Sequence, residues 1–463
     1  MDAPSRPVSG ENLMAAVPAG QHAHWSSRFA FILAAVGSAV GLGNLWRFPF
    51  QTGENGGSAF VLIYIGCVVL FALPVLIAEI AIGRHAQQSA ISSTRKMAQE
   101  AGKSANWAIV GWVCTAGGFL VLTTYSVIAG QVMAYAASGF AGGFAQPDGA
   151  NLFYQGEFIQ LAWHAGFMLI TILIVARGLK GGIEQVATFL MPLFFVMLIG
   201  LTIYSLISGA AGEAITYLFT PDFTAVTGNT FVAALGQAFF SVSVASAIMI
   251  TYGSYLSKDT NIGSSSILIA SADTAVALIA GLMIFPIVFM VGIDPGAGMG
   301  LIFTALPAVF ADMPAGNIIG GAFFALAFIA AITSSISLLE GTVAFVEEHS
   351  DFSRPTAAWL LGFFAFMIGA GAVWSSEFGG VFVDWLSGSF LLPLGGLLVA
   401  VFTGWVIPKA LMRDELSHAS NGLFAFFHFS VKFIVPPAIG FILLLGLDAK
   451  FNGGNIGSLL GLG

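Results

Sequence analysis

Eleven apolar stretches, most of them longer than 20 residues, constrain the fold of this chain more than any other feature. A helix needs about 20 apolar residues to cross a bilayer, whereas strands of a membrane barrel alternate apolar and polar residues over roughly ten positions. The stretches do not alternate, and only 8% of the residues are charged, against roughly 25% in a soluble domain. The sequence therefore predicts an all-α polytopic membrane protein with eleven transmembrane helices.

The expected spans follow the hydropathy of the chain and are 26–50, 57–83, 105–138, 157–176, 183–208, 229–256, 262–292, 316–346, 356–374, 380–408 and 418–447. Residues 1–24 lack the basic start and apolar centre of a signal peptide, so we expect a tail that stays on the chain. The last sixteen residues are too short and too polar for a twelfth span.

The distribution of basic residues predicts the orientation of the spans. Lysine and arginine lie in every loop that follows an even-numbered span, and none lies in the segments 139–156, 209–228, 293–315 and 375–379. By the positive-inside rule we expect a cytoplasmic N-terminus and, with eleven spans, an extracellular or periplasmic C-terminus. The chain is thus expected in the inner (plasma) membrane of the cell, with the lipid bilayer around it.

The composition also excludes several classes of partner and activity. The chain has no basic patch that would bind nucleic acid, and its two cysteines, Cys67 and Cys114, lie inside apolar stretches without the spacing of a disulfide or metal site. It contains no His-Glu-x-x-His, Gly-x-Ser-x-Gly or paired catalytic aspartates, so we do not expect an enzyme. No obligate protein partner is evident.

A glycine-rich stretch in the first span predicts a break in a membrane helix. Gly37, Gly41 and Gly43 lie within seven residues, and glycine lets the backbone leave the helix, which frees amides and carbonyls to bind ions or a carboxylate. Small residues four apart also serve close helix packing, and Gly37 and Gly41 alone fit that interpretation. Asn44 beside the break and Arg47 one turn later favour a binding site.

Two further spans carry hydroxyl and amide groups. The sixth span is interrupted by four polar side chains: Gln237, Ser241, Ser243 and Ser246. An isolated serine can bond to its own backbone, but this is a cluster. In the eighth span the spacing of Ala330, Thr333 and Ser334 directs two hydroxyls and a backbone carbonyl the same way. Ligation by oxygen alone suits a hard alkali cation rather than zinc or copper.

Charges inside the apolar spans are few, and such residues usually line a polar pathway or pair with one another. They are Arg47, Glu79, Asp273, Glu340, Asp384 and Lys432. A structural ion pair, or a side chain that reaches the interface, is the alternative for each residue. We adopt that structural interpretation for Glu340 and Lys432.

Four motifs resemble the signatures of the neurotransmitter:sodium symporters of the bacterial amino-acid type. They are GLGNLWRFP at 41–49, ENGGSAF at 54–60, QAFFS at 237–241 and TSS at 333–335. The resemblance runs from Trp25 to about Gly446 and implies two inverted five-helix repeats, with spans 1 and 6 unwound at the midplane. It implies an N-terminal tail 1–24, repeats 25–210 and 211–412, an eleventh helix 413–448 and an extracellular tail 449–463.

The resemblance also implies two sodium sites. One would be formed by the substrate carboxylate with Ala39, Asn44, Ser241 and Asp273. The other would be formed by Gly37, Val40, Ala330, Thr333 and Ser334.

A substrate site is implied between the same spans, with Tyr125 and the amides of residues 41–43 on a carboxylate and Phe240 as an aromatic lid. Family members that take monoamines carry aspartate at the position of Gly41, so glycine argues for a substrate with its own carboxylate. The residues expected at the substrate are Ala39, Gly41, Leu42, Gly43, Val121, Tyr125, Ile128, Phe240, Ser241, Ser243, Ser246, Ser334, Ser335 and Leu338.

Gates are implied on both sides of the substrate. Arg47 and Asp384 match the outer pair, and Tyr255 and Glu348 match part of the cytoplasmic gate. His22 stands where the family usually has an arginine latch, which is a departure from the family pattern. Residues 245–247 read Ala-Ser-Ala where a Gly-large-Gly segment is usual, which also leaves the unwinding of span 6 open.

The chloride pocket of the family maps onto Tyr64, Gln237, Ser241 and Ala277. Asp273 and Ala277 stand where chloride-dependent members commonly have Asn and Ser. Asp273 lies one helical turn before Ala277, so its carboxylate can supply a fixed negative charge in that region. We therefore expect chloride not to be required.

The function implied is symport of a neutral, apolar or aromatic L-amino acid into the cell by alternating access, driven by two sodium ions. One alternative is proton coupling, with Glu79 or Asp273 as the carrier. Another is a membrane sensor on the same fold that transports nothing.

Overall fold

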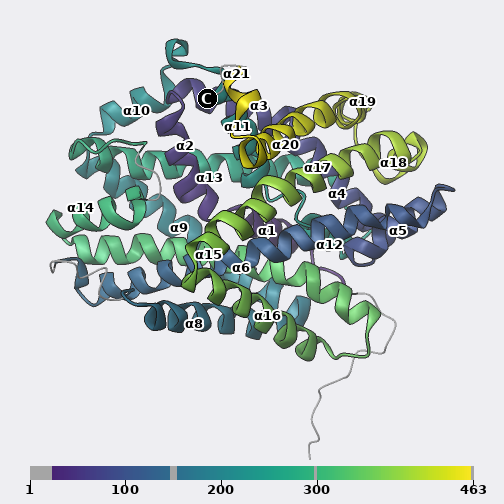
Figure 1. Ribbon diagram of the computed structural model, residues 1–463, viewed down its shortest axis with the longest axis horizontal. Helices are drawn as coiled ribbons and strands as arrows, with labels where there is room; N and C mark the ends of the chain where they lie inside the picture. The colour runs from purple at the N-terminus through teal and green to yellow at the C-terminus, as the bar shows by residue number, and fades with distance from the viewer. Residues whose placement is uncertain (1–22, 146–153, 297–299, 460–463) are drawn as a thin grey trace, which may run out of the picture.

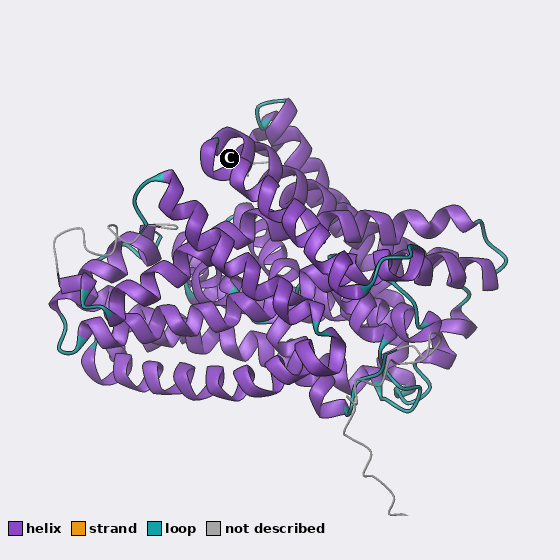
Figure 2. Cartoon of the chain, turned by 90° about the horizontal axis from the view of Figure 1, so that it is seen from below, coloured by secondary structure: helices purple, strands orange, loops and turns teal. Residues whose placement is uncertain are grey.

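Helices form every regular element in the part of the chain that this computed structural model describes, residues 23–145, 154–296 and 300–459. Figures 1 and 2 show these helices packed into a single bundle. The predicted all-α class is confirmed.

Nine helices in the described ranges are long and apolar enough to cross a membrane. They run over Ser58–Ala86, Ala105–Phe140, Glu157–Ala176, Leu179–Ser208, Ile262–Met290, Gly316–His349, Arg354–Trp374, Glu377–Val406 and Asn421–Phe451. A bent pair, Arg28–Ala39 with Gly43–Glu54, raises the number to ten if it is one span. The remaining expected span, 229–256, is divided into two short helices, so the total of eleven stays a prediction.

The helices of the unbroken spans are labelled as in Figure 1. They comprise α3 (Ser58–Cys67), α4 (Leu73–Ala86), α6 (Ile109–Phe140), α8 (Glu157–Ala176), α9 (Gln185–Ser208), α13 (Ile262–Met290), α15 (Gly316–His349), α16 (Arg354–Trp374), α17 (Leu392–Val401), α19 (Asn421–Phe429) and α20 (Val435–Phe451). Further helices lie between these spans: α5 (Ala90–Glu100), α10 (Ala211–Phe219), α14 (Leu306–Asp312) and α18 (Lys409–Glu415). Helix α21 (Asn455–Leu459) follows α20.

The first span breaks in the middle. Helix α1 (Arg28–Ala39) ends where Val40 adopts an extended backbone, with φ −70° and ψ 101°. A wide π-helical turn at Gly43–Arg47 then leads into α2 (Phe48–Glu54), whose second residue is Pro49. The two halves are bent by 50°, and the interruption leaves backbone groups of α1 and α2 without intrahelical partners.

The sixth span breaks as well, although alanine occupies the positions where the family usually has glycine. Helix α11 (Gly228–Ser241) and α12 (Ile248–Ser254) are separated by residues 242–247, in which Ser243, Ala245 and Ala247 have φ of 55°, 66° and 65°. A left-handed backbone costs a residue with a side chain about 1–2 kcal/mol. The unwound segment is therefore strained, and tertiary contacts must hold it.

Those contacts come from α4 and α17. The backbone N–H of Ala245 donates to the carboxyl of fully buried Glu79 at 2.7 Å. On the opposite side, a Cβ added at Gly395 of α17 would lie 3.0 Å from the carbonyl oxygen of Ala245. Glycine in α17 thus makes room for the alanine backbone of span 6.

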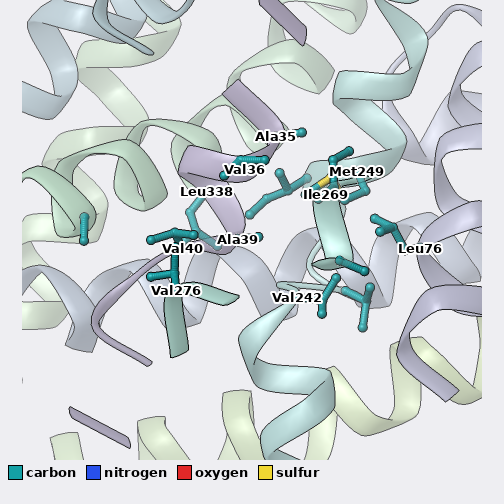
Figure 3. Close-up of a cluster of buried hydrophobic side chains, with 14 of the residues drawn as sticks. Ala35, Val36, Ala39, Val40, Leu76, Val242, Met249, Ile269, Val276 and Leu338 are labelled. Carbon is teal, nitrogen blue, oxygen red and sulfur yellow. The ribbon is translucent and has the colours of Figure 1, made fainter. Parts of the chain in front are cut away.

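The two breaks lie in the core, where α1 packs against α9, α13 and α15. Helices α6 and α15 run along each other through the centre of the molecule (Figure 1). Figure 3 shows the apolar side chains around the breaks, among them Ala35, Val36, Ala39, Val40, Leu76, Val242, Met249, Ile269, Val276 and Leu338.

Candidate functional site

The broken segments of spans 1 and 6 bond directly to each other. Ser243 Oγ donates to the carbonyl of Ser38 at 3.1 Å, and Gln237 Nε2 donates to the carbonyl of Gly43 at 3.3 Å. Polar side chains that are far apart in the sequence are thereby brought to one place in the core of the bundle.

A first polar cluster joins Asn44, Ser241 and Asp273. Asn44 Nδ2 lies 3.1 Å from Ser241 Oγ and 2.8 Å from Asp273 Oδ1, and Ser241 Oγ donates to Asp273 Oδ2 at 2.6 Å. The Asp273 side chain is fully buried, and no lysine, arginine or histidine of the described residues pairs with it. Ala39 is the last residue of α1 and lies buried at the same break. The last carbonyl groups of a helix have no intrahelical hydrogen-bond partner.

This arrangement fits a cation. A carboxylate buried without a countercharge is costly, and a cation bound beside it removes that cost. The neighbouring groups carry oxygen atoms, which suit a hard ion. The amide oxygen of Asn44 here accepts the N–H of Gly41 at 3.0 Å, so it would have to turn toward Asp273 to bind the cation.

A second cluster lies where α1 meets α15. Ser334 Oγ donates to the carbonyls of Ser38 and Ala330, at 3.2 and 3.1 Å, and Thr333 Oγ1 donates to the carbonyl of Ile329 at 3.0 Å. A Cβ added at Gly37 would lie 3.3 Å from Thr333 Cβ, so the helices approach closely there. The hydroxyl protons point at carbonyls, which leaves oxygen lone pairs for a cation.

A small cavity of about 50 Å³ lies beside both clusters. It is lined by Ala39, Gly41, Leu42, Gly43, Asn44, Val121, Tyr125, Phe239, Phe240, Ser243, Val244, Ser246, Ile248, Ser334, Leu338 and Leu392. The N–H of Leu42 points at the Tyr125 hydroxyl, 3.4 Å away. A Cβ at Gly41 would come within 2.9 Å of Ser334 Oγ, so glycine is what keeps this end of the cavity open.

The cavity lining differs in part from the expected substrate residues. Ile128, Ser241 and Ser335 are outside it, and the Ser335 hydroxyl instead lies 2.9 Å from Thr171 Oγ1 on α8. Five lining residues were not expected there: Asn44, Phe239, Val244, Ile248 and Leu392.

A second cavity, of about 470 Å³, lies above Phe240 and is bordered by Arg47. The Arg47 guanidinium lies 4.6 Å from the centre of the Phe240 ring and donates to Gln237 Oε1 at 3.1 Å. Arg47 and Asp384, the expected outer pair, form no direct ion pair among the described side chains, although their charges are close enough to interact. The guanidinium instead contacts Gln237 and Phe240 of α11.

The opposite end of the site is closed. The Trp25 indole donates to the carbonyl of Tyr252 at 3.0 Å, and the Tyr255 hydroxyl donates to Glu340 Oε1 at 2.6 Å. Glu340 also pairs with Arg354 at the start of α16. Glu348, the expected gate residue, instead accepts a bond from the N–H of Ser89, and His22 is outside the described residues.

The pairing of Glu340 with Arg354 agrees with the structural interpretation of Glu340, whereas the position of this pair at the closed end was not expected. A carboxylate inside a span is a sequence signal of function, but the sequence gives no sign that Tyr255 reaches it. Lys432 agrees with its structural interpretation, because its ammonium lies 4.9 Å from the Trp405 ring, on the periphery of the bundle.

Comparisons with known proteins show which family the chain resembles. The profile of the Sodium:neurotransmitter symporter family matches residues 22–159 and 155–450. The uncharacterized sodium-dependent transporter YhdH of Bacillus subtilis (strain 168) is 38% identical over 439 residues, which cover 91% of this chain and 96% of that protein. An uncharacterized sodium-dependent transporter of Haemophilus influenzae is 34% identical over 452 residues, 92% of this chain and 98% of the relative.

The fold is also similar to a solved structure. The crystal structure of MhsT in complex with L-phenylalanine matches with a TM-score of 0.83 and 41% identity, covering 92% of this chain and 99% of that one. These family members and structural neighbours are transporters, not enzymes. The chain belongs to the Sodium:neurotransmitter symporter family of sodium-dependent membrane transporters.

Proposed function

We propose that this protein carries a neutral, apolar or aromatic L-amino acid into the cell together with sodium. The observation that carries the proposal is the position of Asn44, which belongs to the first polar cluster and also lines the cavity. A cation bound at Asp273 would lie next to a substrate carboxylate in that cavity. The occurrence of L-phenylalanine in the MhsT structure supports an amino acid of this class.

The two proposed cations have different partners. The first would be bound by Ala39, Asn44, Ser241, Asp273 and the substrate, so it depends on the substrate directly. The second would be bound by Gly37, Val40, Ala330, Thr333 and Ser334, and would hold α1 against α15. A negative membrane potential contributes about 2.3 kcal/mol per charge per 100 mV, so cations that accompany a zwitterion drive it inward.

Transport would proceed by alternating access. The second cavity, of about 470 Å³, would be the outer one and leads to Phe240. Trp25, Tyr255 and Glu340 close the opposite end of the site. The small cavity beside the two clusters has a volume of about 50 Å³. Common ligand pockets are larger, with volumes of roughly 300 Å³ or more. Binding an aromatic side chain would therefore move Phe240 and the unwound segment of span 6 away from Gly43.

Chloride would not be required. The Asp273 carboxylate is bonded to Ser241, and the Tyr64 hydroxyl donates to the same Ser241 at 3.2 Å. A fixed negative charge therefore already lies among the residues onto which the family's chloride pocket maps. Ala277, one turn along α13, offers an anion no hydroxyl.

The test is uptake of radiolabelled L-phenylalanine by proteoliposomes, with sodium replaced by choline at fixed pH and, separately, chloride replaced by gluconate. We expect loss of uptake in choline and unchanged uptake in gluconate. Uptake that persists in choline but follows a pH gradient would favour the proton-coupled alternative. Binding without uptake would favour a sensor, and loss of uptake in gluconate would overturn the chloride argument.

The arrangement of the chain in the membrane is part of the proposal. The breaks fall in the first and sixth spans, which are the first helices of the two proposed inverted repeats, 25–210 and 211–412. With a cytoplasmic N-terminus, exposed Lys103 would face the cytoplasm and exposed Asp222 the outside. Labelling of Lys103→Cys and Asp222→Cys variants in intact cells by an impermeant maleimide should therefore modify only the second.

A further inference from the structure

A groove of about 320 Å³ lies on the outside of the bundle between α8, α9 and α15, away from the substrate cavity. Helix α8 runs along one edge of the molecule (Figure 1). Phe189 on the rim of the groove is 71% exposed and nearby Leu173 is 43% exposed. Large apolar side chains exposed at this density in a membrane protein face hydrocarbon, so the groove opens toward lipid.

The floor of the groove is made by glycine. The turn between α8 and α9 is a π-helical segment, Leu179–Glu184. A Cβ added at Gly181 would meet no atom within 4 Å, whereas a Cβ at Gly182 would collide with the carbonyl of Ile174. The recess is thus open space above Gly181, and Gly182 lets the turn lie close against α8.

The groove is polar at one end and apolar at the other. Arg177 and Gln185 line it beside the turn, and both are exposed. Ile174 and Ile170 follow on α8, and seven residues of helix place Ile170 about 10 Å deeper than Arg177. Phe328 of α15 completes the apolar part.

The Arg177 guanidinium is available for a ligand. It forms no hydrogen bond or ion pair with any described residue, and no carboxylate lines the groove. A cationic ligand would therefore meet only positive charge. An anionic lipid matches both ends of the groove, because its headgroup can pair with Arg177 and its acyl chain can lie along Ile174 and Ile170.

We propose that this groove is a binding site for an anionic glycerophospholipid, with its phosphate on Arg177 and one acyl chain over Gly181 and along α8. Gly181 and Arg177 are its two determinants: the first provides the space and the second selects the headgroup charge.

The test uses the full-length protein purified in detergent and titrated with phosphatidylglycerol or phosphatidylcholine, with retained lipid counted by native mass spectrometry. We expect retention of phosphatidylglycerol over phosphatidylcholine. Arg177→Ala should weaken phosphatidylglycerol binding about fivefold, the effect of roughly one basic residue at an anionic lipid surface. Arg177→Lys should restore most of it.

Matched variants separate this site from the general lipid surface. Gly181→Leu should abolish the selective retention by filling the groove. Gly200→Leu, on α9 and also without neighbours within 4 Å of its Cβ, should leave it unchanged, as should Lys180→Ala in the same turn. Equal retention of both lipids, or equal retention by Gly181→Leu and Gly200→Leu, would overturn the proposal.

Thermal unfolding in detergent provides an independent readout if a variant folds poorly. Phosphatidylglycerol should raise the unfolding temperature of the unmodified protein and of Arg177→Lys, but not that of Arg177→Ala. Inorganic phosphate alone should have no effect, because it lacks the acyl chain. A rise with phosphate equal to that with lipid would show an anion site instead, and would also overturn the proposal.

Discussion

At the scale of single residues, neighbouring hydroxyls in α15 have different roles because of helix geometry. Successive residues in a helix point about 100° apart. Ser334 therefore faces α1, where it donates to Ser38, while Ser335 faces α8 and contacts Thr171. Both side chains are buried, so they form a matched pair for mutation.

We expect Ser334→Ala to raise the sodium concentration needed for stabilisation, even without amino acid. The proposed second cation would lose one oxygen ligand, and a hydrogen-bonding group to a charge is worth about 1.5–3 kcal/mol, or roughly 10- to 100-fold in affinity. The measurement is the unfolding temperature of purified protein as a function of sodium concentration. Ser335→Ala should leave the sodium dependence as it is, and equal curves for the two variants would remove Ser334 from the cation site.

The helix spacing of Ser334 and Ser335 is visible in the sequence, so the separation of their roles could have been predicted from it. The clustering of Asn44, Ser241 and Asp273 followed only from resemblance, because 197 residues separate Asn44 from Ser241 in the chain. The inward positions of Phe239 and Leu392 could not be predicted. They depend on how α11 and α17 are rotated against the breaks, which neither hydropathy nor spacing records.

At the scale of elements, the unwound segment of span 6 depends on a buried carboxyl from α4. Glu79 accepts the N–H of Ala245, and its second oxygen has no hydrogen-bond partner among the described residues. The left-handed residues of the segment cannot form a regular helix, so their amides need such acceptors.

We expect Glu79→Leu to lower the free energy of unfolding by about 1–3 kcal/mol, because the Ala245 N–H would be left buried without an acceptor. Glu79→Gln keeps an acceptor oxygen, so its free energy of unfolding should fall less than that of Glu79→Leu. The comparison is made by thermal unfolding of both variants. If Glu79→Gln and Glu79→Leu are equally destabilised, the hydrogen bond to Ala245 is not what holds the segment.

A second element contact joins α18 to the end of α4 through Glu415. Burial alone would raise the pKa of Glu415, but hydrogen bonds from His85 and Lys258 and the charge of Arg84 outweigh it and lower the pKa to about 2. A lowered pKa in the folded state means that the carboxylate stabilises the fold above the ordinary value near 4.5. That stabilisation is lost as the pH falls toward 2.

The unfolding temperature should accordingly fall as the pH is lowered from 5 to 3, because this range crosses the ordinary pKa of 4.5 and approaches the lowered one. Glu415→Gln should be less stable than the unmodified protein at pH 7 and should show a smaller fall on acidification. Parallel pH profiles for the two proteins would assign the acid sensitivity to other carboxyls. Circular dichroism during heating at each pH provides the measurement.

At the scale of the whole molecule, one end of the bundle is closed around α1 while the other is open to Phe240. Fully buried Glu340 of α15 connects this closure to α16 through Arg354 and to α12 through Tyr255. Trp25 packs against both Tyr252 and Tyr255, with ring centres 5.1 and 6.1 Å apart. The start of α1 is thereby fixed to the second half of span 6.

We expect Tyr255→Phe to loosen this closure, because Glu340 would lose a hydrogen-bond donor while the aromatic packing against Trp25 remains. Hydrogen–deuterium exchange of the amides in Arg28–Ala39 should become faster without sodium. Exchange in α19, on the periphery, serves as the internal control and should not change. Unaltered exchange in α1 would show that the Tyr255–Glu340 bond does not hold the closed end.

Asn44 would serve both proposed ligand sites at once, because it bonds to Asp273 and lines the small cavity, and this sharing would have a thermodynamic consequence. If both ligands depend on the same side chain, their binding free energies are coupled, and the coupling is reciprocal. Whatever factor the cation adds to the affinity for the amino acid, the amino acid must add to the affinity for the cation. A scarce nutrient would then be captured best where the cation is abundant and released where it is depleted, without any further signal to the protein.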